Sequence, residues 1–271
     1  MITEQVEHEQ THRWARDGWD AECRVGLLVP HADVGPECEL EAMAPAGVTV
    51  HATRVGFGAM AAGGAMDPTI PLAPVRAFAE SPDLDAAATL LAAAPLDVIA
   101  FAFTSSAYVI GAEGEIEMLN RLAQVARGIP VVAATTATLA ALQHLGATRV
   151  ALVTPPWFDR ELIELGKELF EHAGHAVVGA AAAELDSDQR AITPSGLFDW
   201  VRRSTPHDAD AVVIAGNGLR AVGVIAALEQ ELARPVVTAN QALLWAALRA
   251  ADADAGAVSG YGVLFTRGSS S

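Results

Sequence analysis

The sequence contains few cysteine, aromatic and basic residues for its length. Two cysteines in 271 residues, Cys23 and Cys38, argue against a disulfide framework and are typical of a protein of the reducing cytoplasm. Aromatic residues make up 6% of the chain and charged residues 18%, whereas apolar residues, mainly Ala, Val and Leu, reach 52%. This composition excludes a disordered chain and predicts an α/β protein with helices packed on a parallel sheet.

The scarcity of basic residues gives the protein a strongly acidic balance. Lys and Arg number 17 against 33 Asp and Glu, so the formal net charge is −16. Nucleic-acid phosphates and anionic membrane surfaces would be repelled, and neither is an expected partner. A small anionic substrate remains compatible, because local groups in a cleft override the field of the whole molecule.

Several functional motifs are also missing. No stretch approaches the roughly 20 apolar residues of a membrane helix, and the first 20 residues are polar and acidic, unlike a secretory signal. No HExxH or CxxC motif occurs, and the glycine-rich segment 56–64 lacks the strand and helix of a phosphate-binding loop. We interpret that segment as a mobile loop over a cleft, and we expect a cytoplasmic protein without metal or cofactor.

The chain repeats itself. Three segments recur in the same order: RVGLLVP (24–30) as RVALVTP (149–155), DVIAFAF (97–103) as DAVVIAG (210–216), and PVVAATTATLAA (130–141) as PVVTANQALLWA (235–246). The repeat predicts two similar α/β halves with a small-molecule cleft between them.

Strand and helix patterns alternate along the chain. Strands are predicted at 25–29, 48–52, 97–103, 130–133, 149–153, 176–180, 211–215, 235–238 and 257–265. Helices are predicted at 84–93, 114–127, 137–145, 159–173, 195–203, 219–232 and 240–250. Short linkers between them indicate parallel sheets with right-handed crossovers.

We divide the chain into an N-terminal extension, two halves and a short tail. The extension covers 1–23, the first α/β half 24–140, the second half 141–265 and a disordered tail 266–271, with a C-terminal segment that could pack back on the first half. Ligands of such sheets bind at the carboxyl ends of the strands. The loops of interest are therefore 30–38, 103–112, 154–158 and 215–220.

Quoted segments also carry a resemblance to a known family. FTSSA (103–107), GIPVVAATTATLAAL (128–142), ADAVVIAGNGLRAV (209–222) and RPVVTANQALLWAALR (234–249) are similar to segments of the aspartate/glutamate racemase superfamily. Within it, the chain resembles the branch of maleate cis–trans isomerase and arylmalonate decarboxylase, over residues 24–265. The resemblance implies two pseudo-symmetric Rossmann-like half-domains, a substrate carboxylate held between them, and a homo-oligomer, dimer or tetramer.

The resemblance also implies one cysteine at a strand end of each half, serving as base, nucleophile or proton donor. The matching positions here are Phe103 and Gly216, which the internal repeat also aligns with each other. Neither residue titrates, so racemisation by two thiols and protonation by one thiol are both unavailable there. Cys38 is predicted to be structural, and Pro156 occupies the position where the branch often has a tyrosine.

The loops retain other polar groups. Thr104, Ser105 and Ser106 follow a first-half strand and form either a carboxylate cradle or a capped helix start. Asn217 either orients a substrate carbonyl or caps a helix. Gly218 and Leu219 complete the matching second-half loop, where glycine lets backbone N–H groups approach a ligand.

Further candidates follow the first strand of each half. His31 has a side chain suited to acid–base catalysis, and Asp33 would orient it or cap the next helix. Thr154 could contact substrate. Trp157 forms either an apolar wall or a plug between the halves.

Three functions are compatible with these residues. The first is an isomerase- or decarboxylase-like enzyme for a small carboxylate or dicarboxylate, using cofactor-independent, non-thiol proton transfer by His31, a serine such as Ser105, or water. The second is a catalytically inactive carboxylate-binding or regulatory protein. The third is a role in ectoine-type compatible-solute catabolism, as in another member of the superfamily.

Overall fold

A computed structural model describes residues 18–266 of the chain. Most of the predicted extension, through residue 17, and the tail from residue 267 lie outside the described residues.

The strands form two four-stranded parallel sheets with the same order. The first sheet has the order β2 (Val48–Val55), β1 (Cys23–Pro30), β3 (Val98–Phe101), β4 (Val131–Ala133). The second has the order β6 (Ala176–Ala182), β5 (Arg149–Thr154), β7 (Ala211–Ile214), β8 (Val236–Thr238). The predicted fold class is confirmed.

The internal repeat holds at the level of strand register. Val25 of β1 pairs with Val98 of β3, and the residues that the repeat aligns with them, Val150 and Ala211, pair between β5 and β7. These central strands consist of apolar, often β-branched residues and are buried on both faces, as expected of parallel strands covered by helices.

Nine α-helices connect and cover the strands within the described residues. They are α1 (Gly35–Met43), α2 (Leu72–Phe78), α3 (Asp83–Leu91), α4 (Thr104–Val125), α5 (Ala134–Leu145), α6 (Arg160–His172), α7 (Pro194–Ser204), α8 (Ile225–Leu232) and α9 (Ala239–Ala250). The start of α6 follows the predicted cap, because the carboxylate of Asp159 accepts a hydrogen bond of 2.9 Å from the Leu162 N–H.

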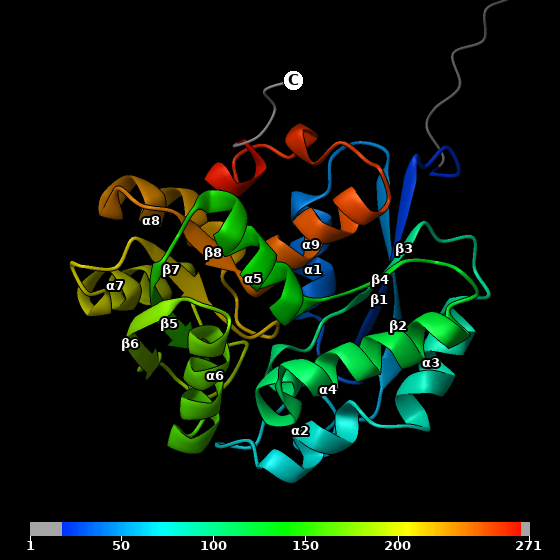
Figure 1. Cartoon of the computed structure of the whole chain (residues 1–271), viewed down its shortest axis with the longest axis horizontal. Coiled ribbons are helices and arrows are strands. Elements are labelled where there is room, and N and C mark those ends of the chain that lie inside the picture. Colours follow the sequence, from blue (N-terminus) through cyan, green and yellow to red (C-terminus); the bar gives the residue numbers. More distant parts are fainter. Residues whose placement is uncertain (1–17, 267–271) are drawn as a thin grey trace, which may run out of the picture.

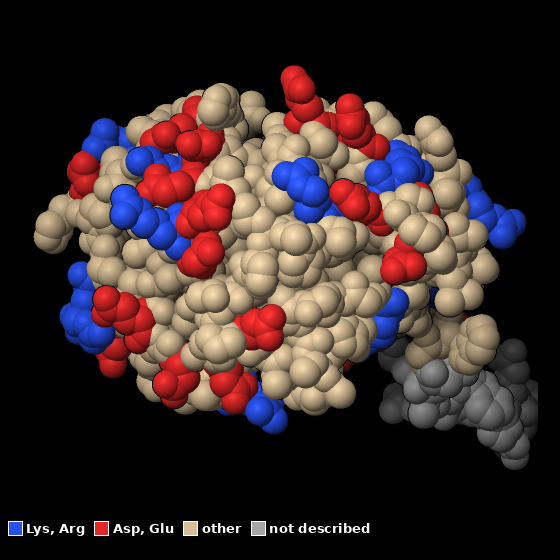
Figure 2. Space-filling model, turned by 90° about the horizontal axis from the view of Figure 1, so that it is seen from below, with Lys and Arg blue, Asp and Glu red and all other residues tan. Residues whose placement is uncertain are grey.

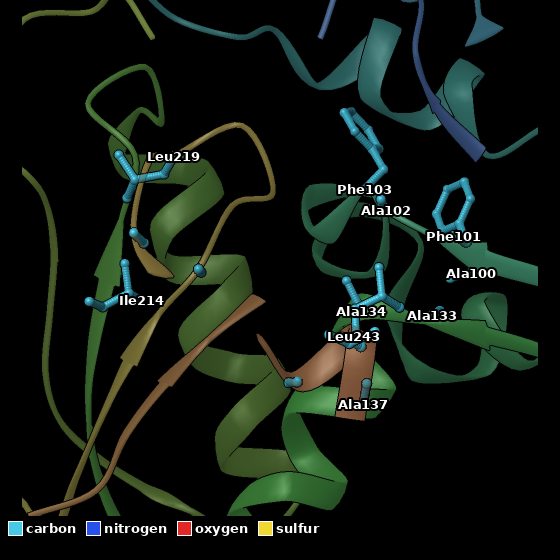
Figure 3. Packing of buried hydrophobic residues seen from close by; sticks show 14 of the residues in the cluster. Ala100, Phe101, Ala102, Phe103, Ala133, Ala134, Ala137, Ile214, Leu219 and Leu243 are labelled. Carbon is cyan, nitrogen blue, oxygen red and sulfur yellow. The ribbon is translucent and has the colours of Figure 1, made fainter. Parts of the chain in front are cut away.

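Helices α5 and α9 join the two halves. They pack against each other, and Figure 1 shows both near the middle of the molecule, with one sheet on either side. Helix α9 also contacts β3 and β4 of the first sheet, although it follows the last strand of the second. In Figure 3, Leu243 of α9 lies beside Ala134 of α5, whereas Phe103 and Leu219 belong to opposite sides of the view.

Some element predictions are wrong. The predicted strand at 257–265 is replaced by two short 3₁₀ turns, η2 (Ala255–Ala257) and η3 (Val263–Phe265), because Gly260 and Gly262 adopt positive φ values that interrupt an extended chain. Helix α4 begins at 104 rather than 114 and continues past a kink at Gly111, where φ is +75°.

Two further differences concern helices near the cavity described below. Helix α8 begins later than predicted, after the 3₁₀ turn η1 (Val222–Val224). Helix α2, seven residues long, was not predicted, because it is too short to show a helical period.

The surface carries charges of both signs. On the face in Figure 2, acidic and basic side chains are interspersed around a largely uncharged middle. The net negative charge is therefore not gathered in one patch on that face. No helix among residues 18–266 is both long and apolar enough to span a membrane.

Candidate active site

A narrow cavity lies where the carboxyl ends of the strands in both halves meet. We call it the inner cavity. Its polar lining comes from both halves: Asp33, Thr104, Ser105, Gln189 and Asn217. The space open to the centre of a water molecule is only about 30 Å³, enough for about two waters at the roughly 10–15 Å³ that one requires. All four predicted loops contribute to this cavity.

Aromatic side chains form much of the apolar wall. The Phe103 ring is 8% exposed and packs with its centroid 4.9 Å from that of Phe57 and 4.2 Å from that of Phe78. Trp157 and Phe158 of the second half also line the cavity and are buried. The side chain of Phe103 therefore belongs to an aromatic cluster of the first half and also gives the inner cavity a dry wall.

Gly216 faces the same cavity from the second half. Its φ is +88°, a conformation that residues with a side chain rarely adopt. A Cβ atom placed on it would lie 2.2 Å from Cγ of Pro155, so the backbone here has no room for a side chain. The two strand-end positions aligned by the repeat thus meet at one cavity, and neither supplies a titratable group.

Asp33 supplies the one titratable side chain among the described residues that line the inner cavity. It is 3% exposed, and its Oδ1 accepts a hydrogen bond of 2.8 Å from the Gly35 N–H. Burial raises the pKa of this carboxyl from an ordinary value near 3.8 to about 6, while Gly35, Gln189 and Arg54 act in the opposite direction. Such a group can both accept and donate a proton near neutral pH.

Gln189 and Gly218 flank this carboxylate. A Cβ atom on Gly218 would lie 2.1 Å from Nε2 of Gln189 and 2.9 Å from Oδ2 of Asp33, so only glycine leaves room for both groups. The Nε2 atom of Gln189 is buried and has no well-aligned hydrogen-bond partner among the described residues. It is therefore a donor available to a bound molecule.

Thr104 and Asn217 occupy equivalent positions of the repeat and bind each other. Oδ1 of Asn217 accepts hydrogen bonds from the Thr104 N–H at 2.8 Å and from the Thr104 hydroxyl at 2.7 Å. Both side chains are buried. The predicted anion cradle is thus partly occupied, since two of its donors already bind the other half of the protein.

This contact continues into a buried polar network. Nδ2 of Asn217 donates to Oδ1 of Asn240 at 2.8 Å, and Nδ2 of Asn240 donates to Oε2 of Glu39 at 2.8 Å. Oε1 of Glu39 accepts from the N–H groups of Ala221 and Val222 at 2.6 and 3.0 Å. The network fixes the loop that carries Gly216 and Gly218 to helix α1 of the first half.

The serines of α4 have different surroundings. Ser105 lines the inner cavity, and no partner for its hydroxyl is found among the described residues. Ser106 is fully buried, and its hydroxyl donates to the Phe103 carbonyl at 2.9 Å instead of facing the cavity. The N–H groups in the first turn of α4 have no partner within the helix, which favours a nearby anion.

His31 lies outside the inner cavity. It is exposed, and its Nδ1 accepts a hydrogen bond of 3.1 Å from the Phe57 N–H. Instead of approaching Asp33, the ring anchors the loop that begins beyond β2. A catalytic role for His31 stays a prediction, but the residue that faces the cavity is Asp33, which was predicted only to bind substrate or to orient His31.

The other predicted contacts divide in the same way. Trp157 lines the inner cavity, and its carbonyl accepts the Ile70 N–H at 3.0 Å. Leu219 is 1% exposed and packs in the core beside the cavity. Thr154 is completely buried, and its Oγ1 has no hydrogen-bond partner among the described residues.

Neither thiol lines the inner cavity. Cys23 is 1% exposed at the start of β1, and burial raises its pKa. Cys38 is exposed on α1. Within the described part of the chain, no three His, Cys, Asp or Glu side chains gather closely enough to hold a metal ion.

Several lining residues were not predicted. Pro30, Phe57, Met66, Ile70, Phe158 and Gln189 also line the inner cavity. Segment 56–70 was expected only to cover the cleft, and three of its side chains do line the cavity. Phe158 was within reach, because the repeat aligns it with Asp33. Gln189 comes from a loop without any motif.

Comparisons with known proteins agree with this arrangement. The chain is 26% identical to maleate isomerase of Pseudomonas putida over 237 residues, 84% of this chain and 92% of that protein. It is 32% identical to arylmalonate decarboxylase of Bordetella bronchiseptica over 143 residues, 52% of this chain and 59% of that protein.

Solved structures show the same fold. The maleate isomerase Iso of Pseudomonas putida S16 superposes with a TM-score of 0.78 at 26% identity, covering 91% of this chain and 98% of that one. The Nocardia farcinica maleate cis–trans isomerase, solved with a covalently bound succinylcysteine intermediate, has a TM-score of 0.77 at 26% identity and covers 92% and 99%. Residues 25–265 match the model of the arylmalonate decarboxylase family, so the chain belongs to that family and to the branch that the sequence segments indicated.

Proposed function

We propose that the protein is an isomerase- or decarboxylase-like enzyme that moves a proton at a carbon next to a carboxylate, without cofactor or thiol. The observation that carries this proposal is Asp33, the one titratable side chain on the described lining of the inner cavity, with a pKa of about 6. A carboxyl of this kind is about one-tenth protonated at neutral pH, so both of its protonation states are accessible.

The lining favours proton transfer over covalent chemistry. The Nocardia farcinica maleate isomerase forms a succinylcysteine intermediate, and such an intermediate requires a thiol at the reacting carbon. Here Phe103 and Gly216 occupy the two strand ends, and both cysteines lie elsewhere. Asp33 is a weak nucleophile towards an alkene, but it is a competent acid or base.

Decarboxylation of a malonate-type substrate uses each wall of the cavity. The carboxylate that leaves would lie against Phe103 and Trp157, where the absence of water destabilises its charge. As the C–C bond to this group breaks, CO₂ departs and the electron pair passes to the remaining carboxylate as an enediolate. Protonated Asp33 then delivers its proton to the carbon and is reprotonated from solvent.

The polar wall would hold the carboxylate that remains. The Ser105 hydroxyl, the free N–H groups at the start of α4 and Nε2 of Gln189 are donors at the cavity. They would bind the developing negative charge more strongly in a dry cavity than in water. Asn217 would position this wall by holding Thr104, rather than by touching substrate.

The test is turnover of substituted malonates and of maleate by the purified full chain in D₂O. We expect incorporation of one deuterium at the α-carbon of the product and loss of activity in Asp33→Asn, whereas the exposed Asp199→Asn control remains active. If protonated Asp33 is required, kcat falls as the pH rises through about 6. If the reaction instead begins by deprotonation of a carbon acid, kcat rises over the same range.

Binding without turnover would refute the enzymatic proposal. A selective rise in melting temperature with one carboxylate, with no deuterium incorporation, would assign the protein to the carboxylate-binding alternative. The ectoine-related alternative would require turnover of a compatible-solute derivative in the same assay. Full activity of Asp33→Asn would show that another group transfers the proton.

A further inference from the structure

A second, larger hollow adjoins the inner cavity. We call it the outer groove. It lies between α1, which contributes Cys38, the loop at 189–194 and the loop at 218–223. The space open to the centre of a water molecule is about 510 Å³, against about 30 Å³ for the inner cavity.

Gln189 and Gly218 line both hollows and form the wall between them. The Gln189 amide nitrogen is held in the wall without a well-aligned hydrogen-bond partner among the described residues. Gly218 adds no side chain to the wall. A molecule that reaches Asp33 from the outer groove would therefore pass a single side chain, and that side chain has an unused donor to offer it.

The sizes of the two hollows restrict the substrate. The inner cavity has room for the reacting carbon and little more, whereas the outer groove has the volume of an ordinary small-molecule site. Most atoms of a substrate larger than a malonate must lie in the outer groove. Val222, Ala42 and Pro194 contribute apolar surface there.

The outer groove also offers an unengaged cation. Arg220 is exposed and forms no hydrogen bond or ion pair with any described residue, although the sequence suggested a structural ion pair. The other arginine of the groove, Arg190, is engaged with Asp188 at 3.1 Å. The acidic side chain in the lining, Glu39, already accepts three hydrogen bonds.

We propose that the outer groove binds the far end of an elongated substrate whose terminal anionic group pairs with Arg220. The inference rests on the proposed function, because it places the reacting carboxylate at Asp33. The substrate class is then a dicarboxylate-type carbon acid that carries an apolar connector and a terminal carboxylate. Guanidinium binds such a group through paired N–H donors.

Two probes of equal length test this proposal. They are hexylmalonate and its counterpart in which the terminal methyl group is a carboxylate, each titrated calorimetrically into the full chain. We expect the wild-type protein to bind the terminal carboxylate about tenfold more tightly than the methyl compound, as for a hydrogen bond to a charged group. Arg220→Gln should abolish or reverse this preference. The matched charge control Arg202→Gln, exposed on α7, should retain it.

Cys38 provides a second readout at the same place. It is exposed and lines the outer groove, whereas Cys23 is buried. Iodoacetamide should alkylate Cys38 several times more slowly when the terminal carboxylate compound is bound, and Arg220→Gln should remove this protection at equal ligand concentration.

The subsite and the enzymatic proposal fail separately. Equal affinities for the two probes, or an unchanged preference in Arg220→Gln, would overturn the subsite even if both compounds are decarboxylated. An Arg220-dependent preference with Cys38 protection would support the subsite even if neither compound is turned over. In that case the proposed reaction fails, and the groove is an anion-binding site of a non-catalytic protein.

Discussion

Replacing Asp33 with Asn should make the folded protein more stable at neutral and alkaline pH while it removes the proposed acid–base group. Folding raises the pKa of this carboxyl from near 3.8 to about 6, so the folded state binds more protons than the unfolded state between these values. The contribution of the protonated form to stability is complete below about pH 4 and is lost as the pH rises through about 6.

The size of the effect follows from the two pKa values. One pKa unit corresponds to about 1.4 kcal/mol, so ionised Asp33 lowers the free energy of unfolding at pH 8 by about 3 kcal/mol relative to its protonated form. The Asn side chain is neutral at every pH, and its Oδ1 can still accept the Gly35 N–H. We therefore expect Asp33→Asn to gain up to about 3 kcal/mol at pH 8, a rise of several degrees in melting temperature.

Urea unfolding of wild type and variant at a series of pH values measures this difference. Burial also raises the pKa of Glu39 and Glu115, so the pH profile of wild type alone does not isolate Asp33. The difference between the two proteins does, because those groups are common to both. Asp199→Asn, at an exposed position, should show no comparable pH-dependent gain.

Two results would refute the reasoning. A gain that is the same at pH 5 and pH 8 would show that the effect is packing and not ionisation. An Asp33→Asn protein less stable than wild type at pH 8 would show that the carboxylate is well solvated or well paired. Either result would remove the physical basis for assigning proton transfer to this residue.

Three further substitutions have defined outcomes. Asn217→Ala leaves two buried donors of Thr104 without an acceptor and should lower the free energy of unfolding in urea by about 3 kcal/mol. Gly216→Cys forces a side chain onto a φ of +88° and against Pro155, so calorimetry should show a lower melting temperature. Phe103→Cys should lose about 3 kcal/mol of aromatic packing but place a thiol on the inner cavity, which mass spectrometry would detect as a new alkylated site.

The sequence contained most of the fold, because the repeated segments include the central strands of both sheets. Their apolar runs are long enough to be recognised, and the strand register is the same in both halves. The segment 257–265 was misread because its composition is that of a buried strand, while Gly260 and Gly262 prevent extension. Tertiary context, and not local pattern, decided that segment.

The site was predicted as a place better than as a set of roles. The strand-end rule located the loops, and Thr104, Ser105, Trp157, Asn217 and Gly218 do line the inner cavity. The ordinary pKa of histidine drew attention to a residue that lies on the outside. A buried aspartate becomes suitable only through desolvation, which depends on neighbours distant in sequence and cannot be read from local pattern.

The two halves differ at one pair of equivalent positions with a consequence for stereochemistry. The repeat aligns Asp33 with Phe158, and both line the inner cavity. One side of a planar enediolate would therefore meet an acid and the opposite side a hydrocarbon ring. A prochiral substrate protonated there should yield a single enantiomer, and exchanging the two side chains should favour its mirror image.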